Sequence, residues 1–354
     1  MVDQYQLSGV DTDEADLGLK NLTTRIKSTW PPTGQGQVLL DIGYYANVVN
    51  VGGQGIAITT DGVGSKSIIA TAMNKYDTIG IDCIAMNVND LICVGATPMS
   101  MVDYIAIDHV DSKILDEIAI GLCVGAKKSN ISISGGEISQ LPDVVNGFDL
   151  SGTAIGHVAI DRILVGKNVQ PGDIVIGIES NGIHSNGLSL VRNTFFSLFK
   201  YKLTHKFDEL DCRLGEELIK PTHIYVNEAL DIMASIRSIK AFAHITSDGF
   251  LNLSRVAADV GFVIDSLPEI PSIFKIIQEL GDIEYSEMFS VFNMGVGFCV
   301  IVDSNEVDNT IKLINNQGKN AQVIGFVTDD KSKTVSIPKY HLVGANKHFK
   351  YEGV

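Results

Sequence analysis

The hydrophobic and polar positions along the chain follow two periods, and these predict a repeated succession of strands and helices. Short β-branched apolar runs such as residues 56–60 are typical of buried strands. The clearest helical pattern lies between Asp77, a plausible N-cap, and Gly95, where Ile81, Ala85 and Val88 share one face. The alternation of the two patterns indicates an α/β protein.

The same patterns predict the remaining elements. Further helices are expected at residues 13–27, 67–73, 112–128, 188–200, 221–236, 250–258 and 306–317. Further strands are expected at residues 99–107, 131–134, 148–160, 174–179, 239–245, 298–303 and 321–327. Because a double turn follows Val165, we predict an arm and loop at residues 1–50, an N-terminal domain at 51–170 and a C-terminal domain at 171–354.

The composition narrows the class of protein. A chain of 354 residues exceeds one comfortable core, which agrees with two domains. Its 45% of hydrophobic and 19% of charged residues are typical of a folded soluble protein, and no apolar run reaches the length of about 20 residues that spans a bilayer. A net charge of −15 disfavours nucleic acid, and five scattered cysteines suit a reducing compartment. We therefore expect a cytoplasmic protein with neither a membrane nor a nucleic-acid partner.

Polar residues that could hold a phosphate ester follow the first predicted strand. Asp61, Gly62 and Gly64 come directly after residues 56–60, and Lys66 opens the next helix. Glycine lets a backbone approach a ligand closely, a carboxylate can hold Mg²⁺ and a lysine can neutralise phosphate. The segment matches neither the P-loop nor the Rossmann pattern, so a tight turn with a solvated lysine is the alternative.

Further acidic residues stand at comparable places. Asp82, Asn89 and Asp90 fall within about 100° of arc on the helix that follows Asp77, where like charges repel unless a cation is shared. The strand predicted at residues 131–134 ends in two glycines and Glu137. Because α/β sheets place ligand groups at the carboxyl ends of their strands, we expect Asp61, Asp90 and Glu137 to converge on a divalent cation that bridges to nucleotide phosphates. A solvated polar helix face is the alternative.

Two turns bear histidines, and one arm residue is a candidate for closing over a ligand. His184 lies between two Asn-Gly pairs before a predicted helix, where it could be an acid, a base, a phosphate ligand or a structural cap. His244 precedes a similar turn. Lys27 could fold over a phosphate or end a solvated helix.

Six short motifs occur in an order typical of one family. They are Thr60-Asp61-Gly62-Val63-Gly64-Ser65-Lys66, the run from Asp77-Thr78-Ile79-Gly80-Ile81-Asp82 through Asn89-Asp90-Leu91, Gly135-Gly136-Glu137, Gly182-Ile183-His184-Ser185-Asn186-Gly187-Leu188, His244-Ile245-Thr246 and Phe292-Asn293-Met294-Gly295-Val296-Gly297. From Ser8 to about Val327 the chain resembles the phosphoribosylformylglycinamidine cyclo-ligase (aminoimidazole ribonucleotide synthetase, PurM) family. The resemblance implies an α/β (α+β) fold of two domains: an N-terminal mixed sheet with helices that contributes strands to the barrel of a homodimer, and a C-terminal α/β sandwich.

The resemblance also implies an activity, ATP-dependent ring closure in purine biosynthesis. The γ-phosphoryl group of ATP passes to the formyl amide oxygen of formylglycinamidine ribonucleotide, and the amidine nitrogen then attacks that carbon and expels phosphate to give 5-aminoimidazole ribonucleotide. The implied catalytic residues are His184, Lys66 and Asp90. The implied ATP contacts are Lys27, Asp61, Gly62, Gly64, Lys66, Asn89 and Asn186. The implied Mg²⁺ ligands are Asp61, Asp90 and Glu137.

Three departures from the family pattern put individual contacts in doubt. Residues 41–46 stand where many members carry a glycine-rich loop, Ile138 replaces a threonine, and Ser247-Asp248 replaces glycines and adds a carboxylate that disfavours phosphate nearby. Two other functions stay open: a kinase that acts on thiamin monophosphate, and a non-catalytic scaffold that binds nucleotide. Turnover of ATP separates the scaffold from the enzymes.

Overall fold

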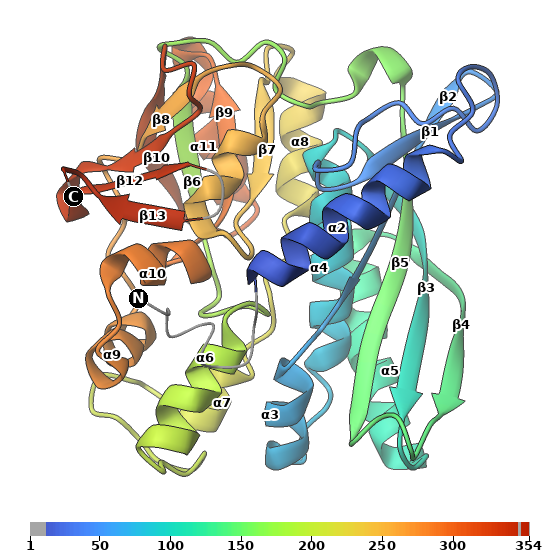
Figure 1. Cartoon of the computed structure of the whole chain (residues 1–354), viewed down its shortest axis with the longest axis vertical. Helices are drawn as coiled ribbons and strands as arrows, with labels where there is room; N and C mark the ends of the chain where they lie inside the picture. Colours follow the sequence, from blue (N-terminus) through green and yellow to red (C-terminus); the bar gives the residue numbers. More distant parts are fainter. Residues whose placement is uncertain (1–11, 346–347, 354) are drawn as a thin grey trace.

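The computed structural model describes residues 12–345 and 348–353, and it contains two β-sheets with helices between and around them (Figure 1). The first residues of the family resemblance, from Ser8 to Asp11, lie outside this range. No helix in the described ranges is long and apolar enough to cross a membrane.

The N-terminal part, up to residue 158, contains the first sheet. Its elements are α2 (Thr12–Lys27), β1 (Asn47–Val51), β2 (Gln54–Gly62), α3 (Lys66–Met73), α4 (Ile79–Cys93), β3 (Thr97–Ile107), α5 (Ser112–Ser129), β4 (Ser132–Gln140) and β5 (Phe148–Val158). The strand order is β1-β2-β5-β3-β4, and β3 and β4 run parallel, whereas the other neighbours are antiparallel. Helices α4 and α5 pack together and cover one face of this sheet.

The C-terminal part contains the second sheet, with strand order β13-β12-β11-β8-β10-β6-β9-β7. Its strands are β6 (Ile174–Glu179), β7 (Ala241–His244), β8 (Gly261–Val263), β9 (Val296–Val302), β10 (Ala321–Thr328), β11 (Val335–Ile337), β12 (Leu342–Ala345) and β13 (His348–Tyr351). Its helices are η1 (Ile160–Arg162), α6 (Leu188–Arg192), η2 (Asn193–Leu198), α7 (Leu214–Leu218), α8 (Val226–Ser235), η3 (Gly249–Arg255), α9 (Ser272–Gly281), α10 (Tyr285–Val291), η4 (Ser304–Glu306), α11 (Val307–Asn316) and η5 (Pro338–Tyr340). The predicted boundary after residue 170 falls in the connection between the two sheets.

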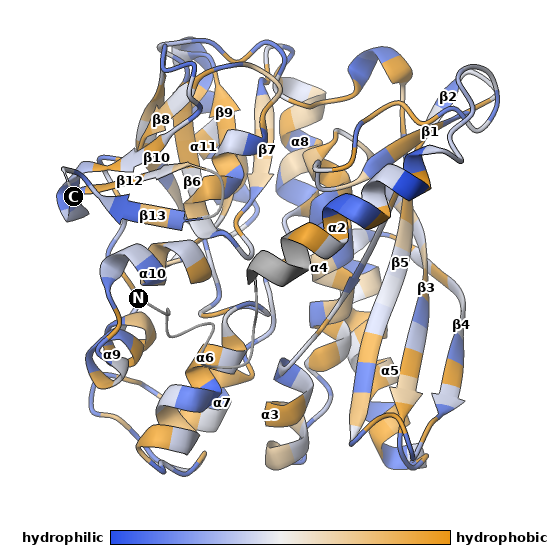
Figure 2. Ribbon diagram, viewed as in Figure 1, coloured by the Kyte–Doolittle hydropathy of each residue, from blue (hydrophilic) through white to orange (hydrophobic). Residues whose placement is uncertain are grey.

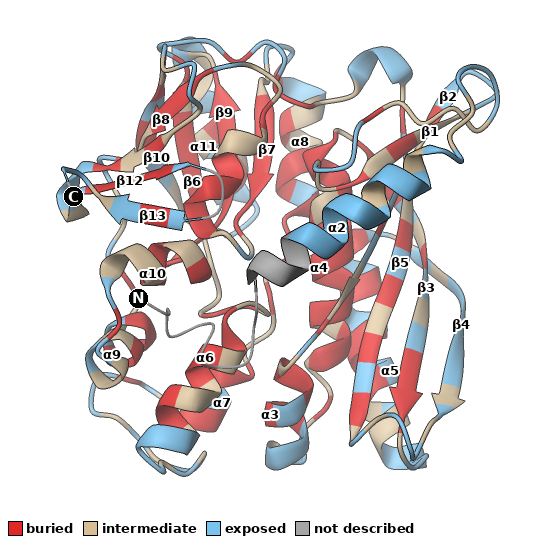
Figure 3. Ribbon diagram, viewed as in Figure 1, coloured by how far each residue is buried: buried red, intermediate tan, exposed pale blue. Residues whose placement is uncertain are grey.

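Helix α4 lies between the two halves and is buried on almost every side (Figure 3). Its apolar residues share one hydrophobic core with Phe242 of β7 and with Phe298 and Val300 of β9. A helix with contacts all round needs apolar residues all round, which agrees with the mostly hydrophobic colouring of α4 (Figure 2). The polar residues Asp82 and Asn89 of this helix are also fully buried, so the predicted polar face points into the molecule.

Two sequence-based boundaries are wrong, and both concern the site. The strand predicted at residues 131–134 continues to Gln140, because Gly135, Gly136 and Glu137 pair with β3. The helix predicted from Pro221 begins only at Val226. The backbone N–H groups of Thr222 and Tyr225 instead donate to side chains of α4.

Other predictions agree in type and differ in extent. Asp111 caps α5 as expected, accepting a hydrogen bond from the backbone nitrogen of Lys113 at 2.8 Å. The N-cap of α4 is Thr78 rather than Asp77. The predicted helix at 188–200 is a short α-helix followed by a π-helical turn, and the one at 250–258 is a 3₁₀-helix. The sequence patterns did not predict β1, β8, α7, α9, α10 or the strands after β10.

Candidate active site

Asp61, at the end of β2, and Asp90, on α4, lie close enough for their charges to interact. The side chain of Asn87 accepts from the backbone nitrogen of Asp61 at 3.1 Å and donates to its carbonyl oxygen at 3.2 Å, which fixes the end of β2 against α4. One carboxylate oxygen of Asp90 lies 2.9 Å from Nδ1 of His244, a buried residue at the end of β7. Strand β2, helix α4 and strand β7 therefore bring two acids and one histidine together.

The carboxyl group of Asp61 has a raised pKa. Burial and, second, the negative charge of Asp90 together raise this pKa from 3.8 to about 6, while the hydrogen bond from the Gly62 backbone and His244 oppose the shift. Two carboxylates at such a place repel each other unless a cation lies between them. Perturbed acids of this kind are frequent in functional sites.

The structure does not bring Glu137 to this pair. Gly62 pairs with Ser151, Ser151 with Tyr104, and Tyr104 with Glu137, so Glu137 lies three strands from the end of β2, about 14 Å away. Residues that pair directly share a face, and the side chain of Asp61 points to the opposite face from that row. Within the described chain, no group of three or more His, Cys, Asp or Glu side chains is arranged to hold a metal ion. The predicted three-carboxylate cluster is therefore not formed in one chain.

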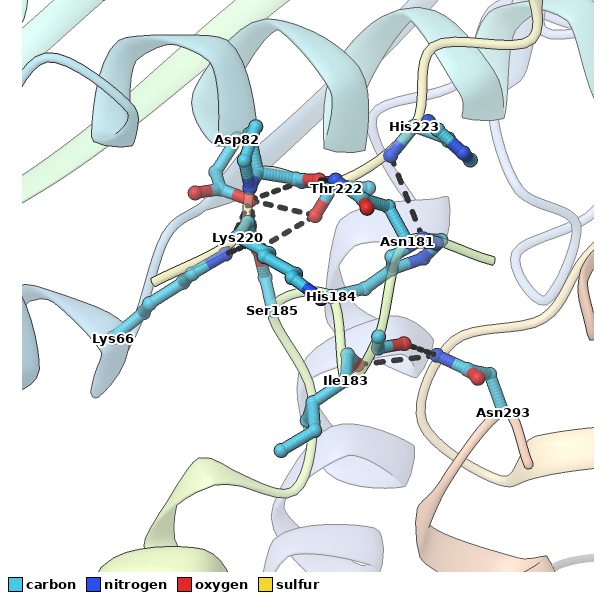
Figure 4. Close-up of polar contacts among 12 residues, drawn as sticks. Lys66, Asp82, Asn181, Ile183, His184, Ser185, Lys220, Thr222, His223 and Asn293 are labelled. Carbon is cyan, nitrogen blue, oxygen red and sulfur yellow. Dashed lines mark hydrogen bonds and ion pairs between the residues drawn. The ribbon is translucent and has the colours of Figure 1, made fainter. Parts of the chain in front are cut away.

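Lys66 forms a buried ion pair at the junction of the two domains (Figure 4). Its Nζ donates to Asp82 at 2.8 Å and to the carbonyl oxygen of Lys220 at 2.5 Å, and both side chains of the pair are 0% exposed. The same oxygen of Asp82 also accepts from the backbone nitrogen and the hydroxyl of Thr222, each at 2.7 Å, and from Ser185 at 3.1 Å. In this conformation Lys66 joins the domains and does not face a solvent-filled site.

His184 is held in a defined protonation state. Its Nε2 accepts from the backbone nitrogen of Asn181 at 3.0 Å and from that of His223 at 3.4 Å. Burial lowers the pKa of His184 well below its usual value, and the charges of His223, His244 and Lys66 lower it further. A neutral imidazole that accepts at Nε2 carries its proton on Nδ1. That Nδ1 is buried without a hydrogen-bond partner in the described part of the chain.

The other predicted residues occupy different surroundings. Asn89 is buried, donates to the carbonyl oxygen of His223 at 2.8 Å and accepts from the backbone of Tyr225 at 3.0 Å, so it supports the junction. Asn186 is partly exposed in the His184 loop. Gly62 ends β2, and Gly64 has a φ of +62° with open space around it. Lys27 pairs with Asp41 and lies 5.7 Å from the ring centre of Trp30.

Several residues that shape the site escaped the sequence patterns. Asn293 donates to the carbonyl oxygens of Gly182 and Ile183 and so supports the His184 loop. Thr222 and His223 were placed in the first turn of a helix, and nothing in that pattern indicated contacts with α4. Asn293 stands inside a motif that the sequence singled out, so its role could have been suspected.

Gly297 leaves the space that His184 and Tyr225 occupy. A Cβ atom at this position would lie 2.1 Å from the hydroxyl oxygen of Tyr225 and 2.6 Å from Cε1 of His184. We expect Gly297→Ala to displace both rings and to lower the free energy of unfolding by about 1–3 kcal/mol. Urea denaturation measures this loss. Gly135→Ala, at an exposed position with nothing within 4 Å, is the control and is expected to have a smaller effect.

The raised pKa of Asp61 predicts a pH-dependent stability. The folded protein holds the Asp61 proton up to a pH of about 6, whereas the unfolded chain releases it near 3.8. The stabilisation is therefore complete below pH 4 and is lost as the pH rises through 6. We expect Asp61→Asn, without added metal, to be more stable than the wild type by about 2–3 kcal/mol at pH 8 and equally stable at pH 4. Equal stabilities at pH 8 in urea denaturation would contradict the prediction.

Comparisons with known proteins identify the family. The model of the N-terminal domain of AIR synthase related proteins matches residues 43–158, and that of the C-terminal domain matches residues 170–338. A phosphoribosylformylglycinamidine cyclo-ligase from Methanobrevibacter smithii is 46% identical over 331 residues, which cover 94% of this chain and 96% of the relative. The chain belongs to the phosphoribosylformylglycinamidine cyclo-ligase family.

Solved structures extend the likeness of fold beyond this cyclo-ligase family. The crystal structure of a HypE–HypF complex aligns with a TM-score of 0.64 at 21% identity, over 86% of this chain and 93% of the other. Thiamine-monophosphate kinase from Stenotrophomonas maltophilia aligns with a TM-score of 0.60 at 18% identity, over 90% and 95% of the two chains. At these identities the likeness concerns the fold alone. The two-domain fold expected from the sequence is confirmed.

The cyclo-ligase chain has a donor set that fits Mg²⁺ in part. Mg²⁺ is commonly bound through one or two carboxylates, with phosphates and water completing six ligands. Asp61 and Asp90 supply two carboxylates with mutually unfavourable charges, which a divalent cation would relieve. They fit a metal that a nucleotide brings with it, whereas a site closed by protein ligands alone is not present in the described residues.

Proposed function

We propose that this chain catalyses the ATP-dependent cyclisation of formylglycinamidine ribonucleotide to 5-aminoimidazole ribonucleotide in purine biosynthesis. The observation that carries the proposal is the 46% identity to a phosphoribosylformylglycinamidine cyclo-ligase over nearly the whole of both chains. The Asp61–Asp90 pair supports it, because it provides the charge that a nucleotide with its metal requires. The alternative, a thiamine-monophosphate kinase, is supported by likeness of fold alone, for example at 18% identity.

The chemistry has two steps. The formyl amide oxygen attacks the γ-phosphorus of ATP, ADP leaves and the amide nitrogen loses its proton, so that the amide becomes an iminophosphate. The amidine nitrogen then forms a bond to the same carbon and loses a proton, the C–O bond breaks, and inorganic phosphate leaves with the oxygen. Phosphoryl transfer of this kind depends mainly on positioning and on neutralisation of charge.

We assign the first step to the end of β2 and the middle of α4. Asp61 and Asp90 are the residues that would hold Mg²⁺, which when bound neutralises phosphate charge. Asn87 keeps the Asp61 backbone in place, and His244 orients the Asp90 carboxylate. Gly62 and Gly64 stay predicted nucleotide contacts, as does Lys27 through movement of the arm, whereas Asn89 would reach a nucleotide only if its amide left His223 and Tyr225.

The hydrogen bonds of His184 and Lys66 change the roles that we propose for these two residues. Because Nε2 of His184 already accepts hydrogen bonds from the backbone, we propose that its Nδ1–H donates to the formyl oxygen of the substrate, with Asn186 orienting the substrate, and that His184 is not a general base. Lys66 would reach a phosphate only if its Nζ left Asp82 and the Lys220 carbonyl oxygen.

The test uses the purified chain with ATP, Mg²⁺ and formylglycinamidine ribonucleotide. The expected result is a diazotisable aminoimidazole, formed together with equal amounts of ADP and phosphate. Omitting the ribonucleotide is the control and is expected to abolish release of ADP. If no aminoimidazole forms and thiamin monophosphate is phosphorylated, the kinase is the correct assignment. If ATP is bound but never turned over, the chain is a scaffold.

We further propose a homodimer in the cytoplasm, built on the uncovered face of the first sheet. This face carries Ile58, Val102 and Tyr104, which are 40%, 43% and 41% exposed. Exposed apolar residues that share one face of a sheet are typical of an interface. Glu137 lies on the same face, so any contribution to a metal site would be made near the partner subunit. Light scattering is expected to give a dimer for the wild type and a monomer for Val102→Glu, with Val144→Glu, 79% exposed in a loop, as the control.

A further inference from the structure

Tyr45 joins the two domains at a place apart from the Lys66–Asp82 pair. It lies in the segment before β1 and packs against both hydrophobic cores. Its hydroxyl donates to the carbonyl oxygen of Asn252 at 3.3 Å, and the guanidinium carbon of Arg255 lies 5.0 Å from the centre of its ring. A cation over an aromatic face is attracted by the ring's negative charge density. One N-terminal side chain is therefore bound twice by η3.

Asp248 holds Arg255 in this position. Nη2 of Arg255 donates to the Asp248 carboxylate at 3.2 Å. The backbone of Asp248 has a φ of +74°, a region that favours glycine and in which an aspartate is strained. The sequence suggested that this additional carboxylate disfavours phosphate nearby. Arg255 balances its charge, so the pair acts locally as a neutral unit.

On the N-terminal side, the Tyr45 segment is hydrogen-bonded to β2, the strand that carries Asp61. The hydroxyl of Thr59 donates to the carbonyl oxygen of Tyr45 at 3.3 Å. Thr59 precedes Asp61 by two residues in β2, and strand geometry leaves little freedom between them. The position of Tyr45 therefore influences where the Asp61 carboxylate lies.

On the C-terminal side, the contact reaches the turn after His244. Nδ2 of Asn252 donates to the carbonyl oxygens of Ser247 at 2.7 Å and Gly249 at 2.8 Å, which closes that turn. His244, at the start of the turn, binds Asp90. Both carboxylates of the candidate nucleotide site are thus connected to the same interdomain contact.

We propose that Tyr45, Asp248 and Arg255 form a clasp between the domains that sets the separation of the Asp61 strand and the His244 turn. The clasp residues act as positioning residues and do not touch the substrate. Tyr45 and Asp248 come from the two segments in which this chain departs from the family pattern, residues 41–46 and 247–248, and both residues contact Arg255 of η3. The inference rests on the proposed roles of Asp61 and Asp90 in holding the nucleotide and its metal.

Substitution of Arg255 tests the clasp, because a positioning residue is expected to change the KM for ATP much more than kcat. Arg255→Gln is expected to raise the KM for ATP about tenfold and to change kcat less than about twofold. Arg255→Lys keeps the charge opposite Asp248 and is expected to restore part of the affinity. Lys275→Gln is the matched control, because Lys275 pairs with Glu269 at 3.1 Å in the same domain without contacting the other domain. An unchanged KM for ATP in Arg255→Gln overturns the clasp.

Two further variants separate a clasp from general damage to the fold. Asp248→Gly removes the carboxylate and also relieves a strained backbone, so it is expected to fold at least as well as the wild type and still to raise the KM for ATP. Tyr45→Leu combined with Arg255→Gln is expected to raise KM no further than the stronger single substitution, because both break one contact. A wild-type KM in Asp248→Gly, or additive effects in the double variant, contradict the clasp.

Equilibrium binding of an ATP analogue with Mg²⁺ distinguishes failure of the clasp from failure of the proposed site. If Asp61→Asn binds the analogue as tightly as the wild type, the assignment of Asp61 is wrong and the clasp loses its basis. If Asp61→Asn binds weakly and Arg255→Gln binds as the wild type does, the site stands and the clasp is wrong. Weak binding by both variants supports both statements.

Discussion

Asp90→Asn is expected to lower kcat for ring closure at least about a hundredfold while the chain stays folded. In the wild type, Nδ1 of His244 lies 2.9 Å from the Asp90 carboxylate. Asparagine has the size of aspartate and keeps an oxygen that can accept this hydrogen bond, so the local geometry is retained. The negative charge is lost, and with it half of the carboxylate pair that would hold the metal on the phosphates. The expected defect is therefore in the chemical step.

The measurement is the rate of aminoimidazole formation at saturating ATP and Mg²⁺, with unfolding followed by circular dichroism. Asp116→Asn is the control, because Asp116 is exposed on α5 and its removal changes the net charge by the same amount. Activity of Asp90→Asn within a few-fold of the wild type would remove Asp90 from the proposed mechanism. Loss of the folded state would instead mean that the charge of Asp90 is needed for stability.

Asp82→Ala is expected to cause the largest loss of stability, about 3–5 kcal/mol. Asp82 accepts from Lys66, from Ser185 and twice from Thr222, all in the buried junction between the domains. Burial lowers the pKa of Lys66, and Asp82 opposes that shift. Without the carboxylate, the lysine must either lose its proton or stay charged and unpaired in a dry interior.

Urea denaturation of three variants measures the contribution of the pair. Lys66→Met is expected to be destabilising as well, because it leaves the Asp82 charge unpaired, and the double variant Lys66→Met/Asp82→Leu is expected to recover much of the loss. Glu269→Ala breaks the exposed pair with Lys275 and is expected to cost less than about 1 kcal/mol. If Asp82→Ala costs no more than this control, the pair does not hold the domains together.

The spacing of hydrophobic residues predicted most helices and strands, because that spacing depends on residues that are close together in the sequence. The strand around residues 56–60, the helix between Asp77 and Gly95 and the cap at Asp111 each depend on neighbouring residues, and each is found close to its predicted place. Glu137 was misplaced because two glycines normally end a strand. Here the parallel partner β3 continues beside them and supplies hydrogen bonds. Strand pairing of this kind depends on the tertiary structure and cannot be predicted from the local sequence.

Of the three acids expected to converge, the structure brings Asp61 and Asp90 near each other and leaves Glu137 on another strand. The proximity of Asp61 and Asp90 follows from a strand end next to a helix, which the pattern could suggest. The burial of Lys66 could not be predicted, because a lysine after glycines is commonly solvated. Its burial depends on Asp82 and on the carbonyl oxygen of Lys220, which lies 154 residues further along the chain. A separation of 140 residues from Asp82 likewise concealed the role of Thr222.

The burial of helix α4 between the two halves affects how the chain folds during synthesis on the ribosome. The helix needs apolar neighbours from β7 and β9, yet those strands are synthesised much later than the helix itself. At 5–20 residues per second, a ribosome takes about 10–40 s to add the roughly 200 residues from Cys93 to Val296. During that interval one flank of α4 is uncovered in the nascent polypeptide. A chaperone that recognises apolar helices therefore has its best target there, and a fragment that stops at residue 158 should aggregate.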